Sequence, residues 1–353
     1  MRELNIRENE AGQRLDKYLK KYLKEAPGSF IYKMLRKKNI VLNGKKADGS
    51  EKLSVGDKVK LFLSEETIEK FSGGQNENVN EMKNLIKKGE QFHIPVIYED
   101  SQVIFLNKPS GMLSQKAEVS DFSVNEYVIS YLLQSGQITE EELRTFRPSI
   151  CNRLDRNTSG IIAAGKTLAA LQQLSELFKI RTLAKYYLCI VKGRIEKSAY
   201  IDGYLKRDID KHKVTIVSKE EFEKEGLKDQ LLPIETEYIP LAYGRELTLL
   251  KVHLITGRTH QIRAHLASKG HPIVGDYKYG DRSFNEPFKK KYHIEDQLLH
   301  AYELTMPELK GVLSGISKKT FTAKVPAFFW KIIEETSWEH GIQEALGVQH
   351  LKI

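Results

Sequence analysis

Residues 92–335 are dominated by short apolar or alternating segments bounded by turn residues, and this pattern most restricts what the chain can fold into. The segments at 103–106, 161–164, 186–191 and 247–254 are typical of strands. Helical periodicity is clear in fewer places, at 168–178 and at 260–269. Because strands outnumber helices and do not alternate with them regularly, the pattern favours an α+β fold with a mixed, largely antiparallel sheet over a doubly wound fold.

The first 63 residues form a smaller unit with a pattern of its own. Apolar residues spaced as on one helix face occupy 15–23, and Pro27-Gly28 separates this helix from a second one over 29–38. Strands are predicted at 40–42 and 59–63, and the first leads into the hairpin turn Asn43-Gly44. We therefore expect a small α/β domain over residues 1–63, separate from a larger domain over residues 92–335.

Positive charge is concentrated in this N-terminal unit. The chain has a net charge of +9, and residues 1–60 contain 16 Lys and Arg against 8 Asp and Glu, so the rest of the chain is nearly neutral. A basic module attached to a nearly neutral body is the electrostatic footprint of a polyanion binder. A merely well-solvated surface is the alternative explanation of the same bias.

The remaining segments and the bulk composition complete the outline. Residues 64–91 include a polar, glycine-bearing stretch at 72–78 without periodicity, which indicates a flexible linker, and residues 336–353 form a helical or frayed C-terminal tail. Cys151 and Cys189 are the only cysteines, which predicts neither a disulfide framework nor a cysteine zinc site. No apolar run reaches the roughly 18–20 residues of a membrane span, and the N-terminus has no apolar signal core. We expect a cytoplasmic protein with no membrane partner.

A polar loop at residues 152–160, between a short strand at 149–151 and an apolar strand, contains Asp155. An aspartate in such a loop often does no more than cap a turn. Residues 160–167 also fit the phosphate-loop pattern, but that motif needs a buried strand before it and a flexible loop within it, and here the order is reversed. Residues 155–160 imitate the start of a calcium loop, yet its twelfth position holds Lys166 in place of Glu. We expect no nucleotide cofactor and no calcium.

Several histidines in the second half of the chain suggest a metal site at first sight. None of them forms a His-x-x-x-His pair or has a carboxylate at ligand spacing. We therefore expect no metal and assign structural or RNA-contacting roles to His253, His260, His265 and His271.

The pattern Arg-Leu-Asp-x-x-Thr-Ser-Gly at residues 153–160, followed by an apolar strand, resembles the signature of the RluA family of pseudouridine synthases. Further landmarks of that family are matched in the expected order at 107–111, 185–187, 256–266, 270–276 and 299–301. Residues 14–45 resemble the RNA-binding domain of the ribosomal protein S-four family. Together these resemblances cover essentially the whole chain.

The resemblance implies an enzyme that isomerises chosen uridines in RNA, by breaking the bond between ribose and N1 of uracil and rejoining the ring through C5. It implies catalytic roles for Asp155, Tyr187 and Arg263. An enclosed carboxylate stays ionised beside a guanidinium, and an aromatic ring can stack on the flat face of uracil. The target base must be flipped out or already unpaired. Because the reaction consumes neither electrons nor water, no cofactor is expected.

RNA contacts are expected in both domains. Arg153 is our candidate for holding the RNA open, and Arg258 and His260 are candidates for backbone contacts, with ordinary surface or core polarity as the alternative for all three. The N-terminal domain would add affinity that tolerates any sequence and weakens with salt, through Lys20, Lys21, Lys33, Arg36, Lys37 and Lys38.

The substrate is predicted from the combination of domains. A domain of the S-four type joined to this body most resembles the branch of the family that acts on large-subunit (23S) ribosomal RNA, and a monomer suffices. Transfer RNA is the alternative substrate, and a non-catalytic RNA-binding ribosome-assembly factor on the same fold is the alternative function. Two departures from the family pattern, at Asn152 and at Gln115, bear on the substrate more than on the chemistry.

Overall fold

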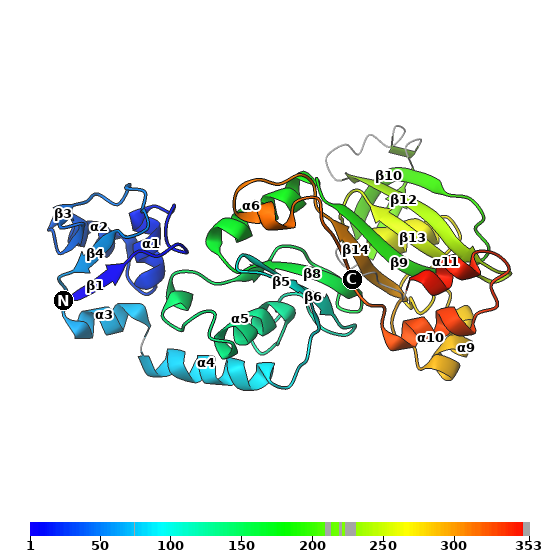
Figure 1. Ribbon diagram of the computed structural model, residues 1–353, viewed down its shortest axis with the longest axis horizontal. Coiled ribbons are helices and arrows are strands. Elements are labelled where there is room, and N and C mark those ends of the chain that lie inside the picture. Colours follow the sequence, from blue (N-terminus) through cyan, green and yellow to red (C-terminus); the bar gives the residue numbers. More distant parts are fainter. Residues whose placement is uncertain (74, 209–212, 219–220, 223–230, 349–353) are drawn as a thin grey trace.

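The computed structural model describes residues 1–73, 75–208, 213–218, 221–222 and 231–348, and it contains two separate sheets (Figure 1). The smaller sheet belongs to the N-terminal domain, and its strands lie side by side in the order β1 (Arg2–Asn5), β4 (Lys58–Leu61), β2 (Ile40–Leu42) and β3 (Lys45–Lys46). Two helices, α1 (Leu15–Tyr22) and α2 (Gly28–Arg36), bury their apolar faces with these strands in one core. The two predicted helices and the hairpin are confirmed.

The segment that follows corrects one prediction. Residues 64–91 were expected to be a flexible linker, but α3 (Glu65–Ser72) and α4 (Gln75–Gly89) occupy most of it. Ser64 caps α3 by accepting a hydrogen bond from Thr67 N, and Gly73 ends that helix in the left-handed conformation. Gly74 of the predicted stretch lies outside the described residues. Met82 is buried in the large core and α4 packs against α5 (Val124–Gln134), so tertiary contacts stabilise a helix that has little apolar periodicity.

The larger sheet has 11 strands within the described residues and forms the body of the second domain. Only the pairing of β8 with β14 is parallel among the described strands, which confirms a mixed, largely antiparallel sheet. Its main path runs in the order β11 (Lys213–Val217), β10 (Ala199–Asp208), β12 (Leu231–Tyr243), β13 (Leu247–Leu254), β9 (Ala184–Lys192), β14 (Leu299–Thr305), β8 (Ser159–Gly165), β6 (Val103–Lys108) and β5 (Val96–Glu99). Two short strands lie off this path: β7 (Ser149–Ile150) pairs with β8, and β15 (Thr320–Thr322) pairs with β14.

Both faces of the central strands are covered, which explains their nearly continuous apolar sequence. Alternate residues of β6 point into different cores. Ile104 and Leu106 belong to one core, and Val103 and Phe105 belong to the other. Besides α5, the described part of this domain contains the helices α6 (Leu168–Ile180), α8 (Gln261–Ser268), α9 (Arg282–Tyr292), α10 (Ala327–Glu335) and α11 (Ile342–Gly347). It also contains the 3₁₀ turns Glu142–Arg144 and Gly311–Ile316.

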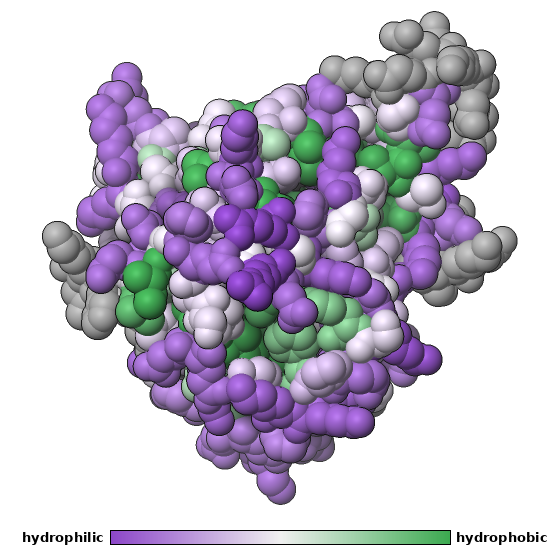
Figure 2. Space-filling view, turned by 90° about the vertical axis from the view of Figure 1, so that its right-hand side faces the viewer, coloured by the Kyte–Doolittle hydropathy of each residue, from purple (hydrophilic) through white to green (hydrophobic). Residues whose placement is uncertain are grey.

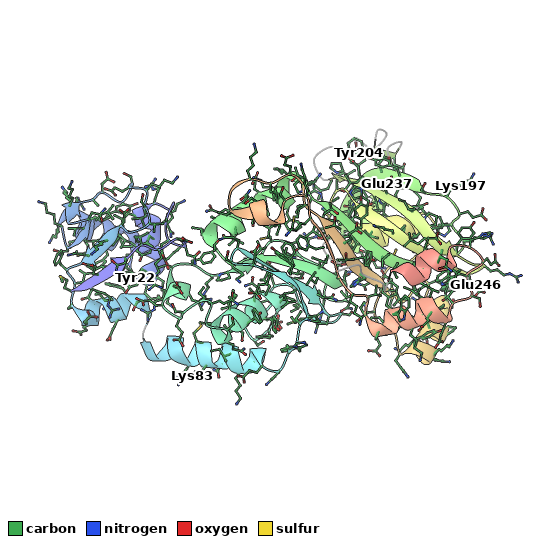
Figure 3. The ribbon with its side chains drawn as sticks, viewed as in Figure 1. Tyr22, Lys83, Lys197, Tyr204, Glu237 and Glu246 are labelled. Atoms are coloured by element: carbon green, nitrogen blue, oxygen red, sulfur yellow. The ribbon has the colours of Figure 1, made fainter. Side chains whose placement is uncertain are left out.

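Polar contacts join the N-terminal domain to the body. The Glu10 carboxylate accepts a hydrogen bond from Thr145 Oγ1 at 2.8 Å, with both residues buried, and Arg7 pairs with Glu142 at 2.9 Å. Tyr22 lies on the side of the N-terminal domain that faces the body (Figure 3). At the opposite end of the molecule, hydrophilic side chains dominate the surface and hydrophobic residues gather in scattered patches (Figure 2). Each helix within the described residues is too short or too polar to cross a membrane.

Candidate active site

The loop that carries Asp155 runs from β7 to β8 and is held by side-chain hydrogen bonds. Ser114 Oγ accepts from the Leu154 amide at 3.0 Å and donates to the Leu154 carbonyl at 2.8 Å. The side-chain amide of Asn152 bonds the backbone of β8 through both its atoms, at 3.0 and 2.8 Å. Asn152, a departure from the family pattern, thus fixes the loop to the sheet. The Asp155 side chain remains 28% exposed beside this framework.

Gly160, the second residue of β8, lies where the backbones of β8 and β14 approach closely. Its φ is +114°, and a Cβ built there would lie 2.2 Å from the carbonyl oxygen of Ala301 in β14. Only glycine fits both the conformation and the space. The next residues continue as β8, so 160–167 form no phosphate-binding loop. Lys166 is instead paired with Glu99 at 2.7 Å, and Thr167 caps α6.

A fork of ion pairs fixes a guanidinium beside Asp155. Arg263, in α8, donates from Nε and Nη2 to both carboxylate oxygens of Asp276 at 2.7 and 3.0 Å, and from Nη1 to Asp155 Oδ2 at 3.2 Å. Burial alone would raise the pKa of Asp276, but its bonds to Arg263 and to two backbone amides lower it overall. The bidentate pair with Asp276 leaves the remaining guanidinium edge aimed at Asp155.

His260 approaches Asp155 from another side. Its Nε2 lies 3.7 Å from Asp155 Oδ2, and its Nδ1 lies 2.9 Å from the hydroxyl of Tyr279. That hydroxyl also accepts the Val214 amide at 3.0 Å, so its own proton is free to bond Nδ1. Burial lowers the pKa of His260 in spite of the opposing charge of Asp155, which favours a neutral imidazole with its N–H on Nε2.

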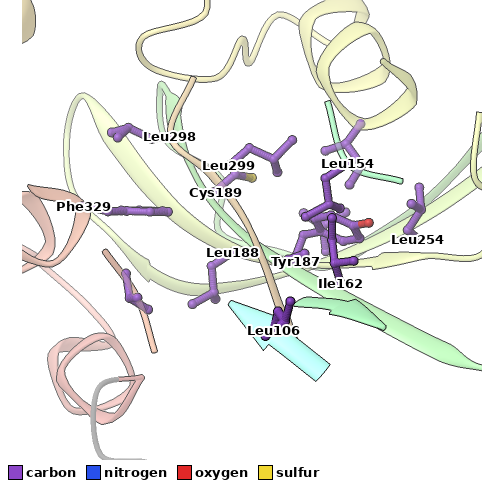
Figure 4. Packing of buried hydrophobic residues seen from close by; sticks show 14 of the residues in the cluster. Leu106, Leu154, Ile162, Tyr187, Leu188, Cys189, Leu254, Leu298, Leu299 and Phe329 are labelled. Carbon is purple, nitrogen blue, oxygen red and sulfur yellow. The ribbon is translucent and has the colours of Figure 1, made fainter. Parts of the chain in front are cut away.

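Tyr187 forms an apolar wall of the same site. It lies in β9 and its ring packs among Leu154, Ile162 and Leu254 (Figure 4). Burial first, and then the charge of Asp155, raise the pKa of the Tyr187 hydroxyl well above its ordinary value. The phenol is therefore protonated at neutral pH, so the free enzyme holds no tyrosinate base.

Lys108 braces the loop from below. Its ammonium group, fully buried at the end of β6, donates to the carbonyls of Pro109, Met112 and Arg156 at 2.9, 2.7 and 2.8 Å. Burial lowers the pKa of Lys108 to about 7, while Asp155 and Asp296 oppose that shift. One side chain thus ties the 109–112 turn to the loop that carries Asp155.

Replacing Lys108 with methionine is expected to destabilise the protein by about 3 kcal/mol, because buried carbonyls lose their donor. Urea denaturation followed by circular dichroism measures the change. Lys116→Met is the matched control, since Lys116 is an exposed lysine whose 3.9 Å pair with Glu126 contributes little. Equal stability of the two variants would contradict a bracing role for Lys108.

The site lies in a pocket of about 900 Å³. The three predicted catalytic residues, Asp155, Tyr187 and Arg263, line it together with the three RNA contacts predicted in the same domain, Arg153, Arg258 and His260. Asp155 is the one acidic side chain among the described residues of the lining. Against it stand eight lysine and arginine side chains: Lys116, Arg153, Arg156, Lys179, Arg181, Lys185, Arg258 and Arg263. The pocket therefore suits an anion whose reacting part meets a carboxylate.

The six N-terminal cations lie outside this pocket. All of them are exposed, on or just after α1 and α2: Lys20, Lys21, Lys33, Arg36, Lys37 and Lys38. Lys21 also lines a second hollow, of about 610 Å³, with Lys24 and Arg147 between the N-terminal domain and the body.

Four residues of the site were not predicted: Lys108, Lys185, Asp276 and Tyr279. Lys108, Lys185 and Asp276 fall within segments that resemble the family, so the signal was present but carried no role. Tyr279 lies three residues beyond such a segment and contacts His260 only in the folded chain.

Comparison with known proteins agrees with the family resemblance of the sequence motifs. Residues 102–268 match the family model for RNA pseudouridylate synthase, and residues 13–59 match the S4 domain. Ribosomal large subunit pseudouridine synthase C of Vibrio parahaemolyticus is 33% identical over 84% of this chain and 86% of that protein. The protein of the same name from Haemophilus influenzae is 31% identical over 87% and 88%.

A solved structure agrees in fold. Human RNA pseudouridylate synthase domain containing 4 superposes with a TM-score of 0.53 at 19% sequence identity, covering 78% of this chain and 99% of that one. At this level of identity the likeness concerns the fold alone. The family assignment therefore rests on the sequence matches. The chain belongs to the RNA pseudouridylate synthase family and has an S4 domain near its N-terminus.

Proposed function

We propose that this enzyme isomerises specific uridines of large-subunit ribosomal RNA to pseudouridine, with Asp155 as its catalytic residue. The observation that carries the proposal is the single carboxylate, held by Arg263, in a pocket lined by cations. The relatives named above act, by their names, on the ribosomal large subunit, and the S4 domain supplies a second basic surface. A non-catalytic assembly factor would need neither this carboxylate nor its buried support.

The chemistry follows from the arrangement. The bond from N1 to C1′ breaks, the uracil turns, C5 joins C1′, and the C5 proton leaves while N1 gains one. Asp155 is the group placed to act on the reacting nucleotide, as nucleophile or as proton acceptor. The hydrogen bond from Arg263 at 3.2 Å and the nearby His260 ring, 3.7 Å away, orient its carboxylate. The Tyr187 ring is placed to stack on the base, and its hydroxyl is a candidate acceptor for the C5 proton during the reaction.

The RNA path combines both domains. We assign catalysis to residues 92–335 and sequence-tolerant binding to residues 1–63, with Arg153 holding the flipped nucleotide's place and Arg258 contacting the backbone. Enzyme and substrate would meet in the cytoplasm, where ribosomal RNA is made and assembled in bacteria.

Tritium release from RNA labelled at C5 of uridine tests the function directly. The label leaves only when C5 joins the ribose, so release from unmodified large-subunit ribosomal RNA reports the reaction itself. Wild-type protein should release tritium, and Asp155→Ala protein should not. Release from transfer RNA alone would reject the proposed substrate, and no release from either RNA would reject the activity.

Stacking by Tyr187 is tested by comparing two substitutions. Tyr187→Phe keeps the aromatic face, so binding of substrate RNA should change by less than about twofold, whereas Tyr187→Ala should weaken it by about 1–3 kcal/mol. Fluorescence anisotropy with a labelled substrate fragment measures both. If phenylalanine and alanine weaken binding equally, the ring does not hold the base.

A further inference from the structure

Lys108, Lys166 and Lys185 are partly or wholly buried lysines of the catalytic domain, and their charges are balanced differently. Lys108 has three carbonyl acceptors, and Lys166 has the Glu99 carboxylate at 2.7 Å. Lys185, the second residue of β9, has no hydrogen bond or ion pair to its ammonium group within the described part of the chain. Burial, and then the neighbouring charge of Arg181, lower the pKa of Lys185 to about 8. The fold therefore places a desolvated cation in the pocket without providing its counter-charge.

More cations converge on the same wall. Arg181 is the left-handed C-cap of α6, with Lys179 in the last turn of that helix, and both line the pocket with Lys185. On the facing turn, a Cβ at Gly257 would lie 3.6 Å from Lys185 Nζ. The next residue, Arg258, has a buried Nε without a hydrogen-bond partner in the described structure.

Lys185 is partly buried beside the like charge of Arg181, and the Nε of Arg258 is buried without a partner in the described structure, so these cations are unfavourably placed until an anion reaches them. The arriving anion removes the repulsion and fills the open donors at once. Arginine and lysine are the side chains that bind phosphate in this way. A phosphodiester monoanion fits the wall because Arg181, Lys185 and Arg258 line the pocket, while Asp155, the one acid of its described lining, is paired with Arg263.

The register of β9 places this wall relative to the reacting base. Lys185 and Tyr187 are two residues apart on one strand, so their side chains leave the same face of the sheet, roughly 7 Å from each other. With a uracil stacked on Tyr187, the wall stands about one strand repeat away, where the backbone of the same or the adjoining nucleotide must pass.

We infer that Lys185, Arg181 and Arg258 form a subsite for one RNA phosphodiester next to the nucleotide bound on Tyr187. This inference rests on the proposed function, because it takes an RNA strand in the pocket as its starting point. The subsite grips the substrate by its backbone and is indifferent to the neighbouring base. It acts on binding of the strand and leaves the isomerisation step to Asp155.

The test measures tritium release and binding of unmodified large-subunit ribosomal RNA by wild type and by Lys185→Gln protein. The substitution should raise KM by about tenfold with kcat changed by less than about threefold, and it should reduce the slope of log affinity against log salt by roughly 0.7–1. Lys185→Arg should restore the KM. Lys197→Gln is the matched control, because Lys197 is exposed at the far end of the domain (Figure 3) and should leave every value unchanged.

The pH dependence gives an independent readout. Free Lys185 loses its proton near pH 8 and bound phosphate favours the charged form, so the wild-type KM should rise as pH increases through about 8. Lys185→Arg protein should show no such rise, since arginine stays charged. The other titratable or charged groups around the pocket are common to both proteins and cancel in the comparison: Lys116, Cys151, Arg153, Asp155, Arg156, Lys179, Arg181, Tyr187, Arg258, His260 and Arg263.

The outcomes separate this inference from the function beneath it. Active wild-type enzyme with an unchanged salt slope and KM in Lys185→Gln protein would overturn the subsite alone. Absence of tritium release by the wild type would overturn the proposed function. The difference in the salt slope of RNA binding between wild type and Lys185→Gln protein would still test the subsite. Thermal melting of each variant distinguishes lost binding from lost folding.

Discussion

Asp155→Asn protein is expected to lose pseudouridine formation by roughly 10³-fold or more while it keeps its fold and its affinity for RNA. Asparagine has nearly the shape of aspartate, but it cannot act as a nucleophile or accept a proton in the required way. Asp155 touches Arg263 without being the main partner of that guanidinium, because Asp276 holds two of its nitrogens. The framework should therefore survive the substitution.

Single-turnover tritium release, with enzyme in excess over substrate, measures this loss without interference from product release. Anisotropy with the same RNA should give a dissociation constant within about threefold of the wild-type value, since most binding comes from the cations of the pocket and of the S4 domain. Glu237→Gln is the control, because Glu237 is a half-exposed acid of β12 that does not line the pocket. Substantial activity in the asparagine variant would assign the chemistry to another group.

The second large effect concerns the stability of the fold. Asp276→Asn is expected to lower the free energy of unfolding by about 3–5 kcal/mol, because it leaves a buried guanidinium without its charged partner. The Asp276 side chain is 0% exposed and that of Arg263 is 9% exposed. Activity should fall too, since Arg263 loses the contact that aims it at Asp155. Urea denaturation at neutral pH gives the free energy.

The same pair predicts how this difference changes with pH. The pKa of Asp276 is lowered in the folded chain, so its contribution is present above the ordinary carboxyl pKa of about 3.9 and is lost as pH falls through the lower native value. The gap between wild type and Asp276→Asn should thus be constant near neutrality and shrink in acid. Glu335→Gln, which breaks the exposed 2.9 Å pair with Lys291, should cost less than about 1 kcal/mol. Similar losses in both variants would contradict the role given to burial.

Sequence patterns predicted those elements whose surroundings are uniform. Strand β8 is buried along its whole length and therefore reads as a continuous apolar run, and α1 has one apolar face. Strands β10 and β12 escaped prediction because Gly203, Pro233 and Pro240 interrupt them, and such residues normally end a strand. Pro240 is accommodated at a bulge in the pairing with β13, which only the neighbouring strand reveals. Helix α9 contains Pro287 and was missed for a similar reason.

The candidate site likewise contains residues that the sequence predicted and residues that it did not. Asp155, Tyr187 and Arg263 were proposed because their neighbours in sequence resemble a family pattern. The partner of Arg263, Asp276, lies 13 positions away on another turn, and no local spacing distinguishes it from an ordinary turn aspartate. Lys185 shows the limit most clearly, because what singles it out is the absence of a described partner. Only a three-dimensional arrangement reveals that property.

The close approach of Gly160 to Ala301 has an evolutionary consequence. Substrate preference can drift through the pocket rim and the S4 domain, where side chains face solvent and many replacements are neutral. The crossing of β8 and β14 has no such latitude, since any side chain at 160 would push the two backbones apart. A protein that lost this glycine would have to separate β8 from β14. The loop that carries Asp155, just before β8, would then lose part of its support. Selection on Gly160 should therefore be coupled to selection on β14, so that substitutions at the two places occur together.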